Sequence, residues 1–156
     1  MKTIILYATK YGAAGEIAWR IAEKTGGAVT YNLKQNPVPS LVEYDCIIFG
    51  SSVYAGMIRG EAKTFLSKNA DVMQEKKLGL FLCGIGESGE KTYFESNFSQ
   101  EILQKAKVKS FLGGIFDPKK AGLIERLIIK LVTKKSSYIN IIDDEKIEKF
   151  AEELKS

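Results

Sequence analysis

Short apolar runs alternate along the chain with segments in which apolar residues recur at helical spacing. This alternation predicts an α/β fold: a doubly wound, five-stranded parallel sheet with helices on both faces. Four runs are continuously apolar, as expected of strands covered on both sides, whereas residues 28–33 alternate in polarity and are expected at an edge. The predicted strands are Thr3 to Ala8, Ala28 to Leu33, Cys46 to Gly50, Leu78 to Cys83 and Phe111 to Ile115.

Helical spacing of apolar residues also predicts helices in the segments between the strands. The first helix carries its apolar face over residues 17–22 and stops at Gly26–Gly27. The closing helix repeats apolar residues over 147–154, with Asp143 and Asp144 as N-terminal caps. Two further helices are expected over about residues 61–69 and 95–105.

An additional amphipathic helix is expected over residues 123–135, between the last strand and the closing helix. Its apolar positions are edged by Arg126, Lys130 and Lys134, which follow one another at four-residue steps. A helix of this kind could rest on a membrane surface or a partner protein. The favoured alternative is that it covers one edge of the sheet, with its lysines reaching past the apolar surface to solvent.

Composition limits the chemistry that the chain can perform. A length of 156 residues and a hydrophobic content of 45% suit one globular domain, residues 1–156. The absence of histidine excludes serine–histidine and cysteine–histidine catalysis and the usual zinc and iron sites, and no metal site is predicted. A net charge of +4 is too small to indicate nucleic-acid binding.

Two further features bear on location and redox chemistry. Cys46 and Cys83 each lie within an apolar run, where buried structural thiols are favoured over a redox or ligand role. The N-terminal apolar run is too short for a signal peptide, and no stretch approaches the length of about 20 residues that a membrane span needs. A cytoplasmic location is therefore expected.

Three loops of small residues follow strands one, three and four. The loop from Thr9 to Gly15 leads directly into a helix, so its backbone N–H groups and the helix dipole could hold a phosphate; a plain glycine turn is the alternative. The loop from Gly50 to Gly56 would lie beside it at the crevice where strand order reverses, and its Tyr54 could stack on a flat heterocycle or simply be exposed. The third, Gly84 to Gly89, spells G-x-G-x-x-G, but it is not in the first strand-to-helix turn and lacks the acidic residue of a dinucleotide site.

These loops make the chain resemble the flavodoxin family over essentially its whole length. The Thr-Lys-Tyr-Gly and Gly-Ser-Ser-Val-Tyr-Ala-Gly segments are most similar to a branch that includes the menaquinone-dependent protoporphyrinogen oxidases. The resemblance implies strand order 2-1-3-4-5 and flavin mononucleotide (FMN) as cofactor. Ala14 stands where the family usually has a phosphate-binding threonine. The implied cofactor contacts are Thr9, Lys10, Tyr11, Gly12, Ala13 and Ala14 for the phosphate, and Ser51, Ser52, Val53, Tyr54, Ala55, Gly56, Gly84, Ile85, Gly86 and Glu87 for the ring.

Two functions remain open for such a site. An FMN electron carrier needs only the three loops, and its partner would be a redox protein or a quinone-like acceptor. An oxidoreductase of the protoporphyrinogen oxidase type would also need a pocket or docking helix, for which residues 123–135 are the candidate. A phosphoacceptor receiver is excluded, because no acidic residue follows strands one and three. Since the flavin carries the chemistry, no catalytic side chain is predicted.

Overall fold

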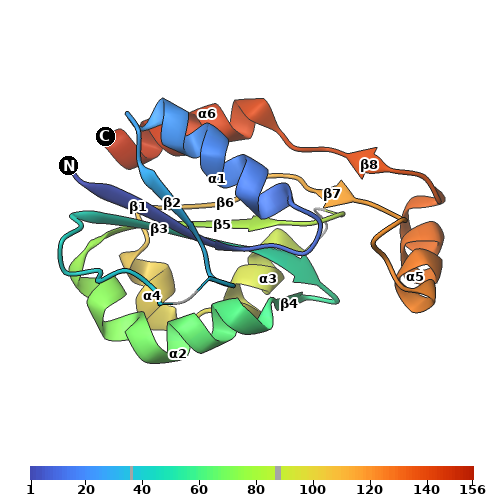
Figure 1. Cartoon of the computed structure of the whole chain (residues 1–156), viewed down its shortest axis with the longest axis horizontal. Helices are drawn as coiled ribbons and strands as arrows, with labels where there is room; N and C mark the ends of the chain where they lie inside the picture. Colours follow the sequence, from blue (N-terminus) through green and yellow to red (C-terminus); the bar gives the residue numbers. More distant parts are fainter. Residues whose placement is uncertain (36, 87–88) are drawn as a thin grey trace.

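A parallel sheet forms the centre of the computed structural model, which describes all residues except 36 and 87–88 (Figure 1). Its strand order is β2-β1-β3-β5-β6, which confirms the predicted doubly wound topology and the edge position of the second run. A short antiparallel strand, β4, pairs with the end of β3. The strands are β1 (Thr3–Ala8), β2 (Val29–Asn32), β3 (Cys46–Tyr54), β4 (Met57–Ile58), β5 (Lys77–Cys83) and β6 (Val108–Phe111).

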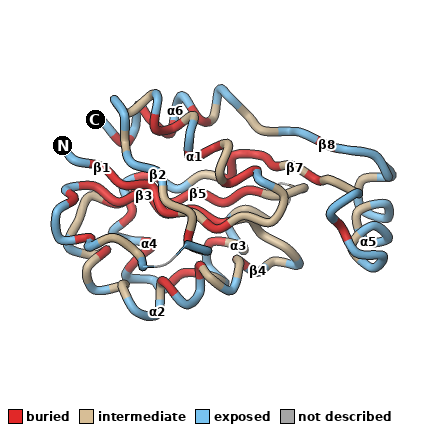
Figure 2. The backbone as a smooth tube through the Cα atoms, in the orientation of Figure 1, coloured by how far each residue is buried: buried red, intermediate tan, exposed pale blue. Residues whose placement is uncertain are grey.

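Helices cover both faces of this sheet, and each face has its own core. Successive residues of a strand point to opposite faces, so Ile4 packs with one core and Ile5 with the other. In Figure 1, α1 and α6 lie above the sheet and α2, α3 and α4 below it, and in Figure 2 the central strands are the most continuously buried segments. The helices are α1 (Ala13–Lys24), α2 (Gly60–Glu75), α3 (Glu90–Asn97), α4 (Gln100–Lys105) and α6 (Asp144–Lys155).

Most predicted elements are confirmed, but several predicted bounds are wrong. β3 continues to Tyr54 instead of ending at Gly50, and α2 continues to Glu75 instead of ending near residue 69. The strand predicted from Phe111 to Ile115 is β6, which ends at Phe111; the chain then bends at Gly113, whose φ is 79°. The helix predicted over 95–105 is two helices, because Phe98 and Ser99 are extended and the Ser99 hydroxyl caps α4 by accepting from the Ile102 N–H. The closing helix α6 buries its apolar face, as predicted, and is capped by Asp143; Asp144, which was also predicted as a cap, is the first residue of the helix.

The chain between β6 and α6 forms a separate appendage at the end of the sheet (Figure 1). Strands β7 (Ile115–Phe116) and β8 (Ile139–Asn140) pair antiparallel, and α5 (Leu123–Thr133) connects them. A small third core holds it together, made of Phe116, Ala121 and Ile139. Within α5, all of which is described, no side chain is buried, so the interpretation that this helix covers a sheet edge is wrong.

Candidate functional site

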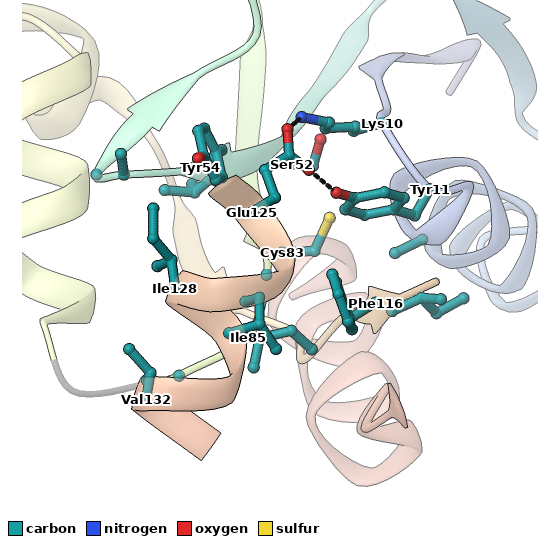
Figure 3. A pocket seen from close by; sticks show the side chains of 18 of the residues that line it. Lys10, Tyr11, Ser52, Tyr54, Cys83, Ile85, Phe116, Glu125, Ile128 and Val132 are labelled. Carbon is teal, nitrogen blue, oxygen red and sulfur yellow. Dashed lines mark hydrogen bonds and ion pairs between the residues drawn. The ribbon is translucent and has the colours of Figure 1, made fainter. Parts of the chain in front are cut away.

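A cavity of about 200 Å³ lies at the carboxyl ends of the parallel strands. The three predicted loops form part of its wall, and α5 closes the opposite side (Figure 3). The position agrees with the rule that ligands of doubly wound sheets bind at the strand ends where the order reverses. Eleven of the predicted site residues line it: Lys10, Tyr11, Ala13, Ser52, Val53, Tyr54, Ala55, Gly56, Gly84, Ile85 and Gly86.

The first loop turns the chain from β1 into α1. The Thr9 hydroxyl accepts a hydrogen bond of 3.0 Å from the Gly12 N–H, and Gly12 takes a φ of 93° that suits glycine. No hydrogen bond from a side chain caps α1 among the described residues, so the N–H groups of its first turn are available to an anion. Ala14 is fully buried in the core beside α1 and, like Thr9 and Gly12, is not among the described residues that line the cavity.

The second loop is a two-residue hairpin turn between β3 and β4. Tyr54 and Met57 form its closing pair, and Ala55 and Gly56 both have positive φ, at 49° and 77°. Two such residues are characteristic of a type I′ turn, and the alanine holds this conformation at a cost of about 1 kcal/mol. The turn fixes Tyr54 in the cavity wall, where the Lys10 ammonium lies 4.7 Å from the centre of its ring.

The two serines before this turn have different environments. Ser51 is fully buried; its hydroxyl donates to the Ser52 carbonyl and accepts from the Arg59 N–H, so its role is structural. The Ser52 hydroxyl faces the cavity, is buried and has no hydrogen-bond partner among the described residues. The Arg59 Nε is also buried and has no hydrogen-bond partner among the described residues. Because buried polar groups are normally satisfied, the Ser52 hydroxyl indicates where a polar ligand would bind, whereas Arg59 is not among the described residues that line the cavity.

The third loop is held by a close approach of two backbones. The Gly84 N–H donates to the Gly113 carbonyl at 3.0 Å, and a Cβ on Gly114 would lie only 2.4 Å from the Gly84 carbonyl oxygen. This contact sets the position of Gly84, Ile85 and Gly86 in the cavity wall. Glu87, the last residue predicted for this loop, lies outside the described residues.

Helix α5 supplies one wall of the cavity. The sequence raised this helix as a possible pocket or docking element, but it assigned none of its side chains to the site. The Glu125 carboxylate, only 16% exposed, pairs with the Lys10 ammonium and accepts from the Tyr11 hydroxyl, which ties α5 to the first loop (Figure 3). Ile128, Ile129 and Val132 continue this wall with apolar surface. Their i, i+3, i+4, i+7 spacing from Glu125 is visible in the sequence, but it does not reveal which side of the helix meets the loops.

Burial and ion pairing perturb the titration of the groups in this tie. Burial would raise the pKa of the Glu125 carboxyl, but hydrogen bonds from Lys10 and Tyr11 and the charge of Arg59 outweigh it, so the pKa lies below its ordinary value. Burial, followed by the hydrogen bond to Glu125, raises the pKa of the Tyr11 phenol. Both effects favour an ionised Glu125 and a neutral Tyr11 at neutral pH.

The floor of the cavity is apolar. Cys83 lies at the end of β5, and burial raises the pKa of its thiol, which therefore remains protonated at neutral pH. Tyr93, Phe111 and Phe116 also face the cavity, and the Phe116 ring packs edge-on to Tyr11 at 5.7 Å between centroids. An apolar cleft with a free hydroxyl, backbone N–H groups and cations at one end is suited to a flat ring with an anionic tail.

The chain is similar in sequence to one protein family and in fold to several solved structures. The family model "Flavodoxin domain" matches residues 4–139. No curated protein matches. Oxidised flavodoxin 1 from Bacillus cereus shares 16% identity with a TM-score of 0.62, over 99% of this chain and 97% of that one.

Two other solved structures differ more in length. A Fusobacterium nucleatum flavodoxin mutant bound to flavin mononucleotide is 24% identical, with a TM-score of 0.51 over 70% of this chain and 68% of that one. The rubredoxin oxygen:oxidoreductase of Desulfovibrio gigas is 15% identical, with a TM-score of 0.59. The match covers 98% of this chain but only 35% of that one.

Proposed function

The chain belongs to the flavodoxin family, and we propose that it binds FMN in this cavity and carries electrons between redox partners. One observation carries the proposal: the loops after β1, β3 and β5 meet around a cavity whose wall holds the buried, unpartnered Ser52 hydroxyl. A polar edge of the flavin ring would satisfy that hydroxyl. The F. nucleatum flavodoxin that contains FMN gives independent support.

The residues present fit this cofactor at both ends. The first turn of α1, with Gly12 at its start, offers N–H groups to the phosphate, and Lys10 adds a nearby positive charge. Tyr54 and the Gly84–Gly86 loop would bind the ring. When bound, FMN supplies one- or two-electron transfer through its isoalloxazine ring. The protein's own contribution is to orient that ring and, through the apolar residues of α5, to exclude water from it.

A second function is favoured by the wall that α5 adds. An oxidoreductase with its own organic substrate, of the protoporphyrinogen oxidase type, needs apolar surface next to the ring, and Ile128, Ile129 and Val132 provide it. The electron carrier needs no such wall. The electron acceptor in either case is a redox protein or a quinone-like molecule, and a cytoplasmic location stays a prediction from the sequence.

Cofactor titration tests the proposal. Apoprotein titrated with FMN, FAD and NAD, followed by flavin fluorescence or calorimetry, should prefer FMN, because the first loop offers a single anion site. Tyr54→Ala should weaken FMN binding by about tenfold through the lost stacking and buried area. Tyr138→Ala is the matched control, since Tyr138 is 57% exposed and not among the described residues lining the cavity. Equal or tighter binding of NAD, or equal effects of the two variants, would refute the proposal.

A further inference from the structure

We propose that the outer face of α5 docks on the surface of an anionic lipid bilayer. This outer face consists of Leu123, Ile124, Leu127 and Leu131, whose exposed fractions are 77%, 72%, 61% and 80%. Leu123, Leu127 and Leu131 follow at four-residue steps and so form one stripe along the helix. Four large, adjacent and strongly exposed aliphatic side chains on a helix of 11 residues indicate a binding surface.

The helix cannot turn this stripe inward, because its other side is already engaged. Glu125 is tied to Lys10 and Tyr11, and Ile128, Ile129 and Val132 border the cavity. The appendage thus presents α5 at one end of the molecule, where Figure 2 shows it largely as an exposed segment, and the outer face lies on the side of the helix that does not border the cavity.

The charges around the outer face of α5 indicate which kind of partner binds it. The segment 119–135 contains six cations, all exposed, and a single carboxylate, Glu125, which faces the first loop. The whole chain has 23 cations and 19 carboxylates, so outside this segment the carboxylates outnumber the cations by 18 to 17. The net positive charge of the protein is therefore concentrated around the apolar stripe. The cations are Lys119, Lys120, Arg126, Lys130, Lys134 and Lys135.

This combination favours lipid over other partners. A second copy of the chain would bring two equally charged faces together, which like-charge repulsion opposes. An anionic bilayer surface instead accepts aliphatic side chains between its headgroups while lysines reach outward to the phosphates. Among the described residues, no helix is long and apolar enough to cross a membrane, so the contact lies in the plane of the interface.

Docking in this way would place the cavity beside the bilayer. The same helix separates the lipid from the cavity, and an α-helix with its side chains is about 10 Å thick. An apolar acceptor dissolved in the membrane would then meet the site at short range. This consequence, unlike the docking itself, rests on the proposed function.

Vesicle flotation tests the docking. Protein is mixed with phosphatidylcholine vesicles or with vesicles of equimolar phosphatidylcholine and phosphatidylglycerol. Binding is expected to the anionic vesicles, with little to the neutral ones, and should weaken as salt is raised. The double variant Leu127→Glu/Leu131→Glu should lose binding by more than tenfold, and Lys130→Glu should lose roughly fivefold or more, since each cation near an anionic surface contributes about that factor.

Matched control variants test whether vesicle binding depends on the outer face of α5 or on the charge of the protein surface in general. Val42→Glu replaces an aliphatic side chain that is 75% exposed, and Lys63→Glu reverses an exposed lysine on α2; both should bind vesicles like the parent. Binding lost equally in controls and α5 variants, or absent from the parent, would overturn the proposal. So would a dimer in solution that Leu127→Glu dissociates without any vesicle binding. FMN titration of the same proteins separates the proposals, because a parent that fails to bind FMN can still dock.

Discussion

Substituting Gly114 tests whether the backbone contact behind the third loop positions the cavity. A Cβ at this position would lie 2.4 Å from the Gly84 carbonyl oxygen and 2.7 Å from the Gly84 nitrogen, whereas real Cβ atoms essentially never come within 3.0 Å of another atom. The two backbones must therefore separate by at least the difference between 3.0 and 2.4 Å. A shift of this size would also stretch the adjacent hydrogen bond from the Gly84 N–H to the Gly113 carbonyl, now 3.0 Å.

The expected loss of stability follows from the steric clash and from the weakened hydrogen bond. Forcing an extra carbon into packed surroundings costs about 1–3 kcal/mol, and a lost hydrogen bond about 0.5–1.5 kcal/mol, so Gly114→Ala should destabilise the protein by about 2–4 kcal/mol. At about 2–4 °C per kcal/mol for a chain of this size, Tm should fall by roughly 5–15 °C. FMN affinity should fall by about tenfold or more, because binding residues must be held within about 0.5 Å.

Thermal unfolding of the apoprotein and an FMN fluorescence titration measure both effects. Gly122→Ala is the control: Gly122 has an ordinary φ of −73°, and a Cβ there would meet no described atom within 4 Å. Its stability should stay within about 0.5 kcal/mol of the parent. If Gly114→Ala unfolds and binds FMN like Gly122→Ala, the contact does not position the loop.

Two further predictions concern the phosphate loop and its tie to α5. Ala14→Thr should destabilise the apoprotein by about 1–3 kcal/mol, because Ala14 is fully buried in the core and does not border the cavity; thermal unfolding measures the loss, and an unchanged Tm would contradict it. Because the folded-state pKa of Glu125 lies below its ordinary value of 4.5, the ion pair's stability is full above that pH and is lost as pH falls through the folded-state pKa. Glu125→Gln should accordingly unfold about 1 kcal/mol more easily than the parent at pH 7, and the difference should shrink as pH is lowered below 4.5, measured in urea; a difference that does not shrink in acid would exclude the ion pair as its cause.

Much of the fold was predictable because its elements are locally consistent. Continuous apolar runs mark strands buried on both faces, and β1 and β5 match their predictions closely. The errors arose where tertiary contacts override the local pattern. Gly113 ends the apolar run after Phe111, since its positive φ and its approach to Ile141 redirect the chain into β7. Ser99 interrupts an otherwise helical segment by capping the next helix.

The site was predictable only as far as the loops go. Tyr54 and Ser52 could be placed at the crevice because parallel strands end at a common edge. The tie from Glu125 to Lys10 joins residues that are 115 positions apart, and helical periodicity gives no information on such a distant pairing.

The small separate core of the appendage has a consequence for dynamics. Releasing the appendage exposes the buried side chains of Phe116, Ala121 and Ile139, at a cost of roughly 4 kcal/mol by area, and also breaks the contact of Glu125 with Lys10 and Tyr11. The cost lies near the lower end of the 5–15 kcal/mol typical of global unfolding, so such a partial opening would be populated in at most about one molecule in a thousand. Amide hydrogens of α5 should therefore exchange with solvent well before those of β1 and β3, and a cofactor could enter through this transient state while the sheet remains intact.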